Sequence, residues 1–250
     1  MFKSSLSIVV PAYNEEVRLG DSLRTILIYL KAENPSAELI VVDDGSTDAT
    51  VEVAETVCAE FPDIRTKILG YDKNRGKGYA VRKGLHKAKG DIALFSDADL
   101  STPISELPKL VAPIDDGKYD VTFGSRALDR TLIETHQSAF REQGGRLINL
   151  MIRQMSGLPF SDTQCGFKAF KMRKFRPLLD AMTINRFGFD VEFLFVAKYH
   201  KLKLKEIPVR WSHCDGTKVS AVRDTRRMFN ELRQIRRNLK RGVYDKIEKP

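Results

Sequence analysis

Four short strand-like segments that alternate with longer amphipathic segments constrain how the first hundred residues can fold. They cover residues 6–10, 39–42, 66–69 and 92–95, and those at 39–42 and 92–95 have the apolar composition of buried strands. The segments between them show helical spacing, with apolar side chains at three- and four-residue steps from about residue 15 to 31. Strands that alternate with helices form a doubly wound parallel sheet with its functional loops at one edge. The sequence therefore predicts an α/β fold.

The second half of the chain continues this pattern less regularly. Residues 120–123 and 202–209 are predicted strands, and residues 140–155 and 222–241 are predicted helices. We expect a mostly parallel sheet with helices on both faces, followed by a basic amphipathic helix at the C-terminal end.

Side chains with distinctive chemistry follow the first four predicted strands. In strand order they are Tyr13 and Glu15, then Asp44, then Lys77, then Asp97 and Asp99. Because open α/β sheets bind ligands beyond the carboxyl ends of their strands, we expect these side chains to meet in one crevice. The set suits a nucleoside diphosphate, since Gly76 and Gly78 allow close approach of backbone to phosphate oxygens. Alone, Gly76-Lys77-Gly78 is a weak motif that is more often an ordinary turn.

Asp97 and Asp99 are one residue apart, directly after the apolar segment 92–95. In extended chain, residues i and i+2 project to the same side, so the two carboxylates repel each other. A shared proton or a divalent cation relieves such repulsion. We predict Mg²⁺ or Mn²⁺ at Asp97 and Asp99, carrying a diphosphate, with Asp99 as the direct ligand. The alternative is that both are solvated turn residues, one of them capping the next helix.

Several classes of function are disfavoured. The chain has neither a Walker phosphate loop nor a Gly-x-Gly-x-x-Gly motif after the first strand, which disfavours ATPase and dehydrogenase activity. Its three cysteines form no disulfide framework or zinc pattern, which favours a reducing compartment. A strand begins almost at once and no stretch approaches about 18 apolar residues. We therefore expect a cytoplasmic protein, soluble or peripheral on the cytoplasmic membrane face.

The positive charge is concentrated at the C-terminal end. The chain carries a net charge of +9, and residues 219–250 hold ten Lys and Arg against four acids. Such a segment suits a polyanionic surface. The predicted helix at 222–241 could lie on an anionic bilayer, or it could pack on the domain through its apolar face, with a solvated basic face outward. Nucleic acid is disfavoured because no recognised binding motif accompanies the charge.

Several motifs in this order and spacing resemble those of the inverting family 2 glycosyltransferases, which have the GT-A fold. The motifs are Val-Val-Pro-Ala-Tyr-Asn-Glu-Glu at 9–16, Val-Val-Asp-Asp-Gly-Ser at 41–46, Asn-Arg-Gly-Lys-Gly at 74–78, Asp-Ala-Asp at 97–99, Phe-Gly-Ser-Arg at 123–126, Asp-Thr-Gln-Cys-Gly-Phe-Lys at 162–168 and Phe-Asp-Val-Glu at 189–192. Within the family, the chain is most similar to the polyprenyl-phosphate branch, above all to the dolichyl-phosphate β-glucosyltransferases. No Gln-x-x-Arg-Trp signature of processive synthases is present.

The resemblance implies roles on the donor side. Residues that would hold the nucleotide are Pro11, Tyr13, Glu15, Val42 and Asp44. On the same resemblance, Asp97, Ala98 and Asp99 would contact ribose, sugar and metal. From their positions in the chain, we expect Lys77, and Lys218 in the loop after Trp211, to contact the donor phosphates. Where mannose synthases often have a metal-binding Gln, this chain has Ser101, which leaves the third protein ligand open.

On the acceptor side, Arg126 and Arg141 are the candidates for binding the phosphate of a lipid, because arginine binds phosphate bidentately. The alternative for each is a surface ion pair. Asp162 stands where a general base is sometimes proposed in this family. A phosphate nucleophile is already anionic near neutral pH, so we rank Asp162 and Gln164 first as positioning residues.

The predicted activity is metal-dependent inverting transfer of a hexose, glucose from UDP-glucose, to a polyprenyl or dolichyl phosphate. The alternatives are GDP-mannose as donor, a hydroxyl group as acceptor, and a nucleotide-sugar binder without turnover. We expect a glycosyltransferase domain at 1–218, with a nucleotide-sugar half at 1–101 and an acceptor half at 102–218, and a basic helical tail at 219–250.

Overall fold

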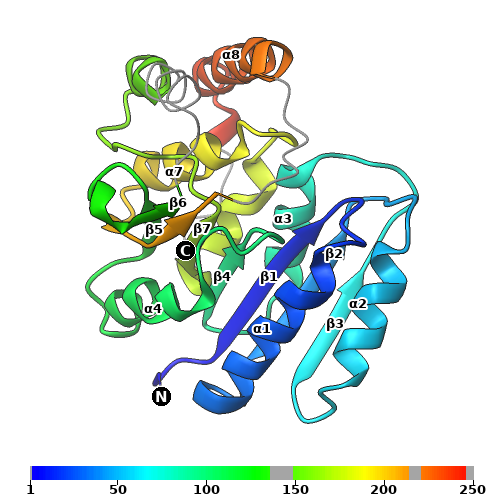
Figure 1. The fold of residues 1–250 in the computed structure, drawn as a ribbon. Helices are drawn as coiled ribbons and strands as arrows, with labels where there is room; N and C mark the ends of the chain where they lie inside the picture. The colour runs from blue at the N-terminus through cyan, green and yellow to red at the C-terminus, as the bar shows by residue number, and fades with distance from the viewer. Residues whose placement is uncertain (1, 136–148, 214–220, 246–250) are drawn as a thin grey trace.

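The computed structural model describes residues 2–135, 149–213 and 221–245. A seven-stranded sheet with the order β3-β2-β1-β4-β7-β5-β8 forms its centre, and two short strands, β6 and β9, pair in parallel beside it (Figure 1). The strands are β1 (Leu6–Ala12), β2 (Glu38–Asp43), β3 (Arg65–Leu69), β4 (Ile92–Ser96), β5 (Val121–Ser125), β6 (Ile133–Thr135), β7 (Phe167–Lys171), β8 (Leu204–Pro208) and β9 (Trp211–Ser212). The predicted doubly wound, mostly parallel sheet is confirmed. In the first half of the chain, the pairs β1–β2, β1–β4 and β2–β3 are all parallel.

Helices cover both faces of the sheet. They are α1 (Leu19–Glu33), α2 (Thr50–Ala59), α3 (Lys77–Lys87), α4 (Leu107–Asp115), α6 (Met172–Phe175), α7 (Phe189–Tyr199) and α8 (Ala221–Lys240). Residues 149–156 are also helical. Short 3-10 turns occur at Ile104–Glu106, Arg130–Leu132, Arg176–Ala181 and Val243–Asp245.

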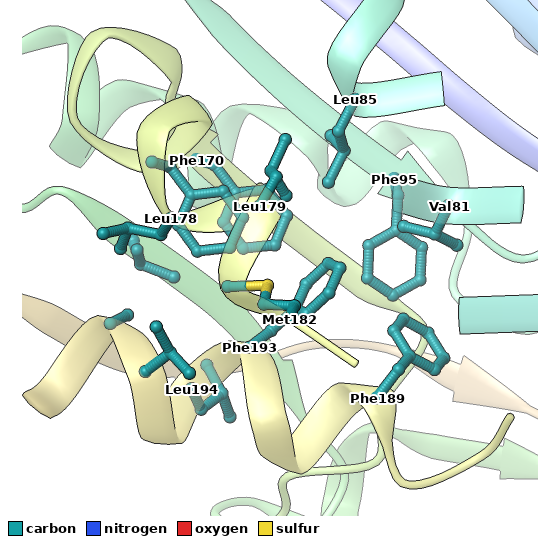
Figure 2. Packing of buried hydrophobic residues seen from close by; sticks show 14 of the residues in the cluster. Val81, Leu85, Phe95, Phe170, Leu178, Leu179, Met182, Phe189, Phe193 and Leu194 are labelled. Atoms are coloured by element: carbon teal, nitrogen blue, oxygen red, sulfur yellow. The ribbon is translucent and has the colours of Figure 1, made fainter. Parts of the chain in front are cut away.

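Alternate residues of each strand pack into two separate cores, because successive side chains of a strand point to opposite faces. Ile8 and Val10 of β1 pack with α1, α2 and α4 on one face. Val9 and Phe95 pack with α3, α7 and α8 on the other. Figure 2 shows aromatic and aliphatic side chains of this second core, among them Phe95 beside Phe189. The two cores hold the sheet rigid, so the loops at its edge have fixed starting points.

Strand β7 was not among the predicted strands, and it runs antiparallel between β4 and β5. Its sequence, Phe-Lys-Ala-Phe-Lys, contains two lysines, which are typical of an exposed strand. Lys168 is nevertheless 0% exposed. A buried ammonium group requires a buried partner, which comes from α7, far along the chain. A local sequence pattern could not reveal that partner.

The apolar face of α8 packs against the second core, with Met228, Leu232 and Ile235 buried. Tyr244, just beyond α8, is also fully buried. Of the two alternatives for this segment, the structure shows the helix packed on the domain. Within 2–135, 149–213 and 221–245, none of the helices has the length and apolar character needed to cross a membrane.

Candidate functional site

The loops after β1 and β2 are tied together at one edge of the sheet. The backbone N–H of Asn14 donates to Ser46 Oγ at 2.9 Å, and that of Thr47 donates to Asn14 Oδ1 at 2.8 Å. Asn14 has a left-handed backbone with φ 52°, which asparagine tolerates well. Tyr13 is 38% exposed beside this contact. Its ring is therefore available to a ligand at the carboxyl ends of the strands.

Other residues predicted for the nucleotide form the base of this edge or pair within it. Pro11 and Val42 are buried register partners in β1 and β2. The Glu15 carboxylate forms an ion pair with Arg18, and its backbone N–H donates to Thr50 Oγ1 at 2.7 Å.

The Asp44 carboxylate organises the loop that leads into α3. It is buried and accepts hydrogen bonds from the Tyr71 hydroxyl at 2.6 Å, the Asn74 amide at 2.9 Å, and the backbone N–H groups of Arg75 and Gly76 at 2.8 Å each. A carboxylate offers about four acceptor positions, so these donors engage it fully. Asp44 therefore shapes the loop that precedes Lys77.

Gly76 needs to be glycine for two reasons. Its φ of 102° lies in a region that other residues rarely adopt, and a Cβ there would lie 2.4 Å from the carbonyl oxygen of Asn185. The loop therefore packs directly on the segment before α7, and α3 begins at Lys77 in a fixed position.

Lys77 and Asp97 form an ion pair between the start of α3 and the end of β4, with 2.5 Å between Nζ and Oδ1. Burial alone would lower the pKa of Lys77, but the nearby carboxylates of Asp97 and Asp190 outweigh it and raise that pKa. Both side chains remain partly exposed. The lysine therefore stays charged and within reach of an anionic ligand.

Asp99 is partly exposed, and its Oδ1 accepts the backbone N–H of Ser101 at 3.0 Å. The part of the chain that the structure describes contains no group of three or more His, Cys, Asp or Glu side chains suited to a metal. Two carboxylates are, however, the donor set with which Mg²⁺ is held when substrate phosphates and water complete its coordination. Asp97 and Asp99 therefore fit a divalent cation that arrives with a diphosphate.

Arg126 and Asp162 form a bidentate ion pair at the end of β5. The Nε and Nη2 groups of Arg126 donate to the two carboxylate oxygens at 2.6 and 2.9 Å. Burial opposes ionisation of Asp162, but the Arg126 guanidinium outweighs it and lowers the pKa of the carboxyl to about 2. Such a group is a poor general base near neutral pH. The ion pair fixes the orientation of the Asp162 carboxylate against Arg126.

The same pair changes the interpretation of Arg126, whose first partner is a carboxylate of this chain. Asp162 engages two of the five guanidinium N–H donors, and three lie outside the pair. The guanidinium carbon is 5.6 Å from the ring centroid of Trp211. The Arg126 guanidinium therefore lies between the Asp162 carboxylate and the Trp211 ring, and the N–H groups outside the ion pair can bind an anion.

Glu206 in β8 anchors this side of the site, although no motif or periodicity in the sequence pointed to it. Its carboxylate accepts the Ser125 hydroxyl at 2.7 Å and the backbone N–H groups of Ser161 and Asp162 at 2.9 and 2.7 Å. A single acid in a late strand resembles any exposed polar residue. Only the pairing of β5 with β8 brings Glu206 within hydrogen-bond distance of Asp162.

Two polar groups next to Asp162 are buried without a hydrogen-bond partner within the described ranges, namely the Thr163 hydroxyl and the Gln164 amide nitrogen. A buried donor without a partner is costly, so both can hydrogen-bond a ligand that enters here. Ala98 is buried between the two aspartates. The predicted Arg141 and Lys218 lie outside the described residues.

The residues predicted for the donor side and those predicted for the acceptor side meet at a backbone hydrogen bond. The N–H of Asp97 donates to the carbonyl of Gly166 at 3.0 Å, which joins the end of β4 to the 162–166 loop. Asp97 is also among the groups that raise the pKa of Arg126. Lys77, Asp97 and Arg126 therefore belong to one site.

Comparisons with known proteins identify related sequences. Residues 7–179 match the family described as Glycosyl transferase family 2. A dolichyl-phosphate beta-glucosyltransferase of Drosophila melanogaster is 37% identical over 244 residues, which cover 92% of this chain and 74% of that protein. The Homo sapiens protein of the same name is 32% identical over 250 residues, with coverage of 96% and 77%.

Solved structures with a similar fold include glucosyl-3-phosphoglycerate synthase from Mycobacterium tuberculosis. Its complex with phosphoglyceric acid matches with a TM-score of 0.69 and 19% identity, over 93% of this chain and 80% of that one. Its complex with Mn²⁺, UDP-glucose and phosphoglyceric acid matches with a TM-score of 0.66 and 20% identity, over 96% and 80%. At these identities the similarity concerns the fold.

Proposed function

The chain belongs to glycosyl transferase family 2 and has the GT-A fold, and from this premise we propose that it transfers glucose from UDP-glucose to a dolichyl or related polyprenyl phosphate. The names of the two relatives described above support this acceptor and this sugar. The observation that carries the proposal is the meeting of Lys77, Asp97 and Asp99 with Arg126 in one site. It provides cationic groups for two phosphorylated substrates on either side of an anomeric carbon.

On the donor side, Lys77 binds the diphosphate at the N-terminal end of α3, where backbone N–H groups also favour an anion. Asp97 and Asp99 would hold Mg²⁺ or Mn²⁺, which stabilises negative charge on a leaving diphosphate when bound. Tyr13, Pro11 and the backbone around them accommodate the nucleoside. Preorganised charges of this kind are commonly the largest catalytic contribution.

On the acceptor side, the N–H groups of Arg126 that Asp162 does not engage bind the phosphate of the lipid. One phosphate oxygen attacks the anomeric carbon opposite the nucleoside diphosphate. The new carbon–oxygen bond forms as the bond to the diphosphate breaks, and the configuration inverts. No base is needed because the phosphate is already ionised, which agrees with the low pKa of Asp162.

A donor assay tests this proposal. Radiolabelled UDP-glucose and GDP-mannose are each offered with polyprenyl phosphate and Mn²⁺ or Mg²⁺, and the product is extracted into organic solvent. We expect label in the organic phase from UDP-glucose alone, and its loss when EDTA removes the cation. Label from GDP-mannose alone would show that the donor is GDP-mannose and not UDP-glucose. The absence of label in the organic phase with both donors would overturn the proposal.

We also propose that the outward face of α8 contacts an anionic membrane surface on the cytoplasmic side. Arg226, Arg233 and Arg237 are exposed and share one face of the helix, opposite the buried Met228 and Ile235. Because the apolar face is packed in the core, the contact is electrostatic and involves no insertion of that face. Cys58 and Cys165 are free thiols, which suits a reducing compartment.

Charge reversal at Arg226, Arg233 and Arg237 tests this contact. Each basic residue near an anionic surface contributes about 1 kcal/mol, so replacing all three by Glu should abolish co-sedimentation with phosphatidylserine vesicles. The matched control replaces the exposed Lys67, Lys87 and Lys89 by Glu, which changes the net charge equally. Equal loss in both variants would show an effect of net charge alone, and unchanged binding in the first would remove the proposal.

A further inference from the structure

A second ion pair lies behind the first and is almost completely buried. Lys168 of β7 and Asp190 in the first turn of α7 are 2.5 Å apart, with side chains 0% and 6% exposed. Lys168 Nζ also donates to the carbonyl of Cys165 at 2.6 Å. The removal of two charges from water offsets most of their attraction, so apolar residues of similar size are often at least as stable. Stability alone is therefore a weak reason for this pair.

One end of the pair supports Asp97. Lys168 fixes the carbonyl of Cys165, and the next residue, Gly166, accepts the N–H of Asp97 through its own carbonyl at 3.0 Å. A Cβ on Gly166 would lie 2.1 Å from Asp97 Oδ2. The turn held by Lys168 is thus in direct contact with the Asp97 carboxylate.

The other end of the pair lies in the first turn of α7, which is in contact with the first turn of α3. The first turns of α3 and α7 touch, since a Cβ on Gly78 would lie 2.5 Å from Phe189 Cβ. Asp190 follows Phe189, and its charge acts on Lys77. The four charged groups therefore alternate in sign from Asp97 through Lys77 and Asp190 to Lys168.

We propose that Lys168 and Asp190 are positioning residues that fix the orientation of Asp97 and Lys77 for binding of the donor diphosphate. Lys168 does so through the turn at Cys165 and Gly166, and Asp190 through its charge beside Lys77. When an anionic diphosphate draws Lys77 away from Asp97, Asp190 still holds the lysine on the donor side. The assignment rests on the proposed function, because it concerns the same donor site.

The first test replaces the pair by apolar residues in the variant Lys168→Met/Asp190→Leu. If the pair only filled the core, this variant should fold and work like the wild type. We expect a thermal midpoint close to that of the wild type, together with a loss of about tenfold or more in UDP affinity with Mn²⁺ and in kcat/KM. Unchanged UDP affinity and transfer in a folded double variant would overturn the proposal.

A second variant, Gly166→Ala, leaves the pair intact and disturbs the same contact. The added methyl group must displace the Asp97 carboxylate, so UDP affinity with Mn²⁺ should fall while the thermal midpoint stays. This variant decides the question if the double variant is unstable. Gly20→Ala in α1 is the control, with its Cβ 3.3 Å from a flexible Val53 methyl group. Wild-type affinity in Gly166→Ala would contradict the supporting role of the turn.

Wild-type protein measured beside these variants separates the two proposals. Absence of hexose transfer by the wild type overturns the proposed function. Calorimetric binding of UDP with Mn²⁺ still compares the variants in that case, because it needs no turnover. Transfer by the wild type and the folded double variant alike overturns only the positioning role.

Discussion

Replacement of Asp99 by alanine is expected to lower hexose transfer by a factor of about 100 or more while the protein remains folded. Asp99 is partly exposed at the end of β4, and the bond that its carboxylate accepts from Ser101 N–H contributes only about 1 kcal/mol. The proposed contact between the Asp99 carboxylate and the cation forms only when the donor binds, so its loss should not unfold the protein. The measurement is kcat/KM with UDP-glucose and saturating polyprenyl phosphate, alongside a thermal melt.

Asp63→Ala is the matched control for this variant, since Asp63 is an exposed aspartate whose ion pair with Lys31 is 3.7 Å long. It should retain full transfer and stability, because exposed pairs contribute little. A second readout is the affinity for Mn²⁺ in the presence of UDP, which should fall in Asp99→Ala and not in the control. Transfer by Asp99→Ala above about a tenth of normal would mean that the cation is held elsewhere.

Asp162→Asn is expected to destabilise the protein by about 3 kcal/mol. Asparagine keeps the shape but leaves Arg126 without its bidentate partner, in a position where the Arg126 side chain is only 30% exposed. For a chain of this length, such a loss lowers the thermal midpoint by about 6–12 °C. Transfer should fall as well, because Arg126 is no longer aimed at the acceptor phosphate. Urea unfolding at neutral pH measures the first effect.

The pH dependence distinguishes positioning from base catalysis. The folded-state pKa of Asp162 is about 2, below its ordinary value, so its stabilisation is complete above about pH 5 and is lost as pH falls towards 2. Asp162→Asn should therefore lose less stability than the wild type over that interval. A plot of wild-type kcat/KM against pH should show no rise or fall caused by Asp162 between about pH 6 and 9. Such a change would mean that Asp162 acts as a general base.

Asp116→Asn serves as the control for Asp162→Asn. Asp116 pairs with Lys118 at 3.0 Å, but both side chains are largely exposed. The same chemical change at this surface position should alter the free energy of unfolding by no more than about 0.5 kcal/mol. A similar loss in both variants would mean that burial of the Arg126 pair does not matter.

The sequence was sufficient to predict the first half of the fold and the edge of the sheet at which its strand-end loops gather. Periodic apolar residues identify strands and helices locally, and parallel strands must carry their loops to the same edge. Tyr13, Asp44, Lys77 and Asp97 could therefore be grouped although they are far apart in the chain. The structure places their loops together through hydrogen bonds and the Lys77–Asp97 ion pair.

The partners of the charged groups could not be predicted in this way. Arg126 was expected to face a lipid phosphate, but Asp162, 36 residues later, engages it first. Lys168 resembled an exposed residue, and its partner Asp190 lies on another element. Such pairs join residues whose separation in sequence carries no information about distance.

What the sequence determined by itself was the alternation of strands and helices, the edge of the sheet at which the strand-end loops gather and the family to which the chain belongs, because these depend on local periodicity and short motifs. The tertiary structure alone decided the antiparallel insertion of β7, the packing of α8 on the domain and the choice of partner for each buried charge. The physical reason is that a buried charge must be neutralised by whichever opposite charge the packing of distant elements brings within a few ångströms.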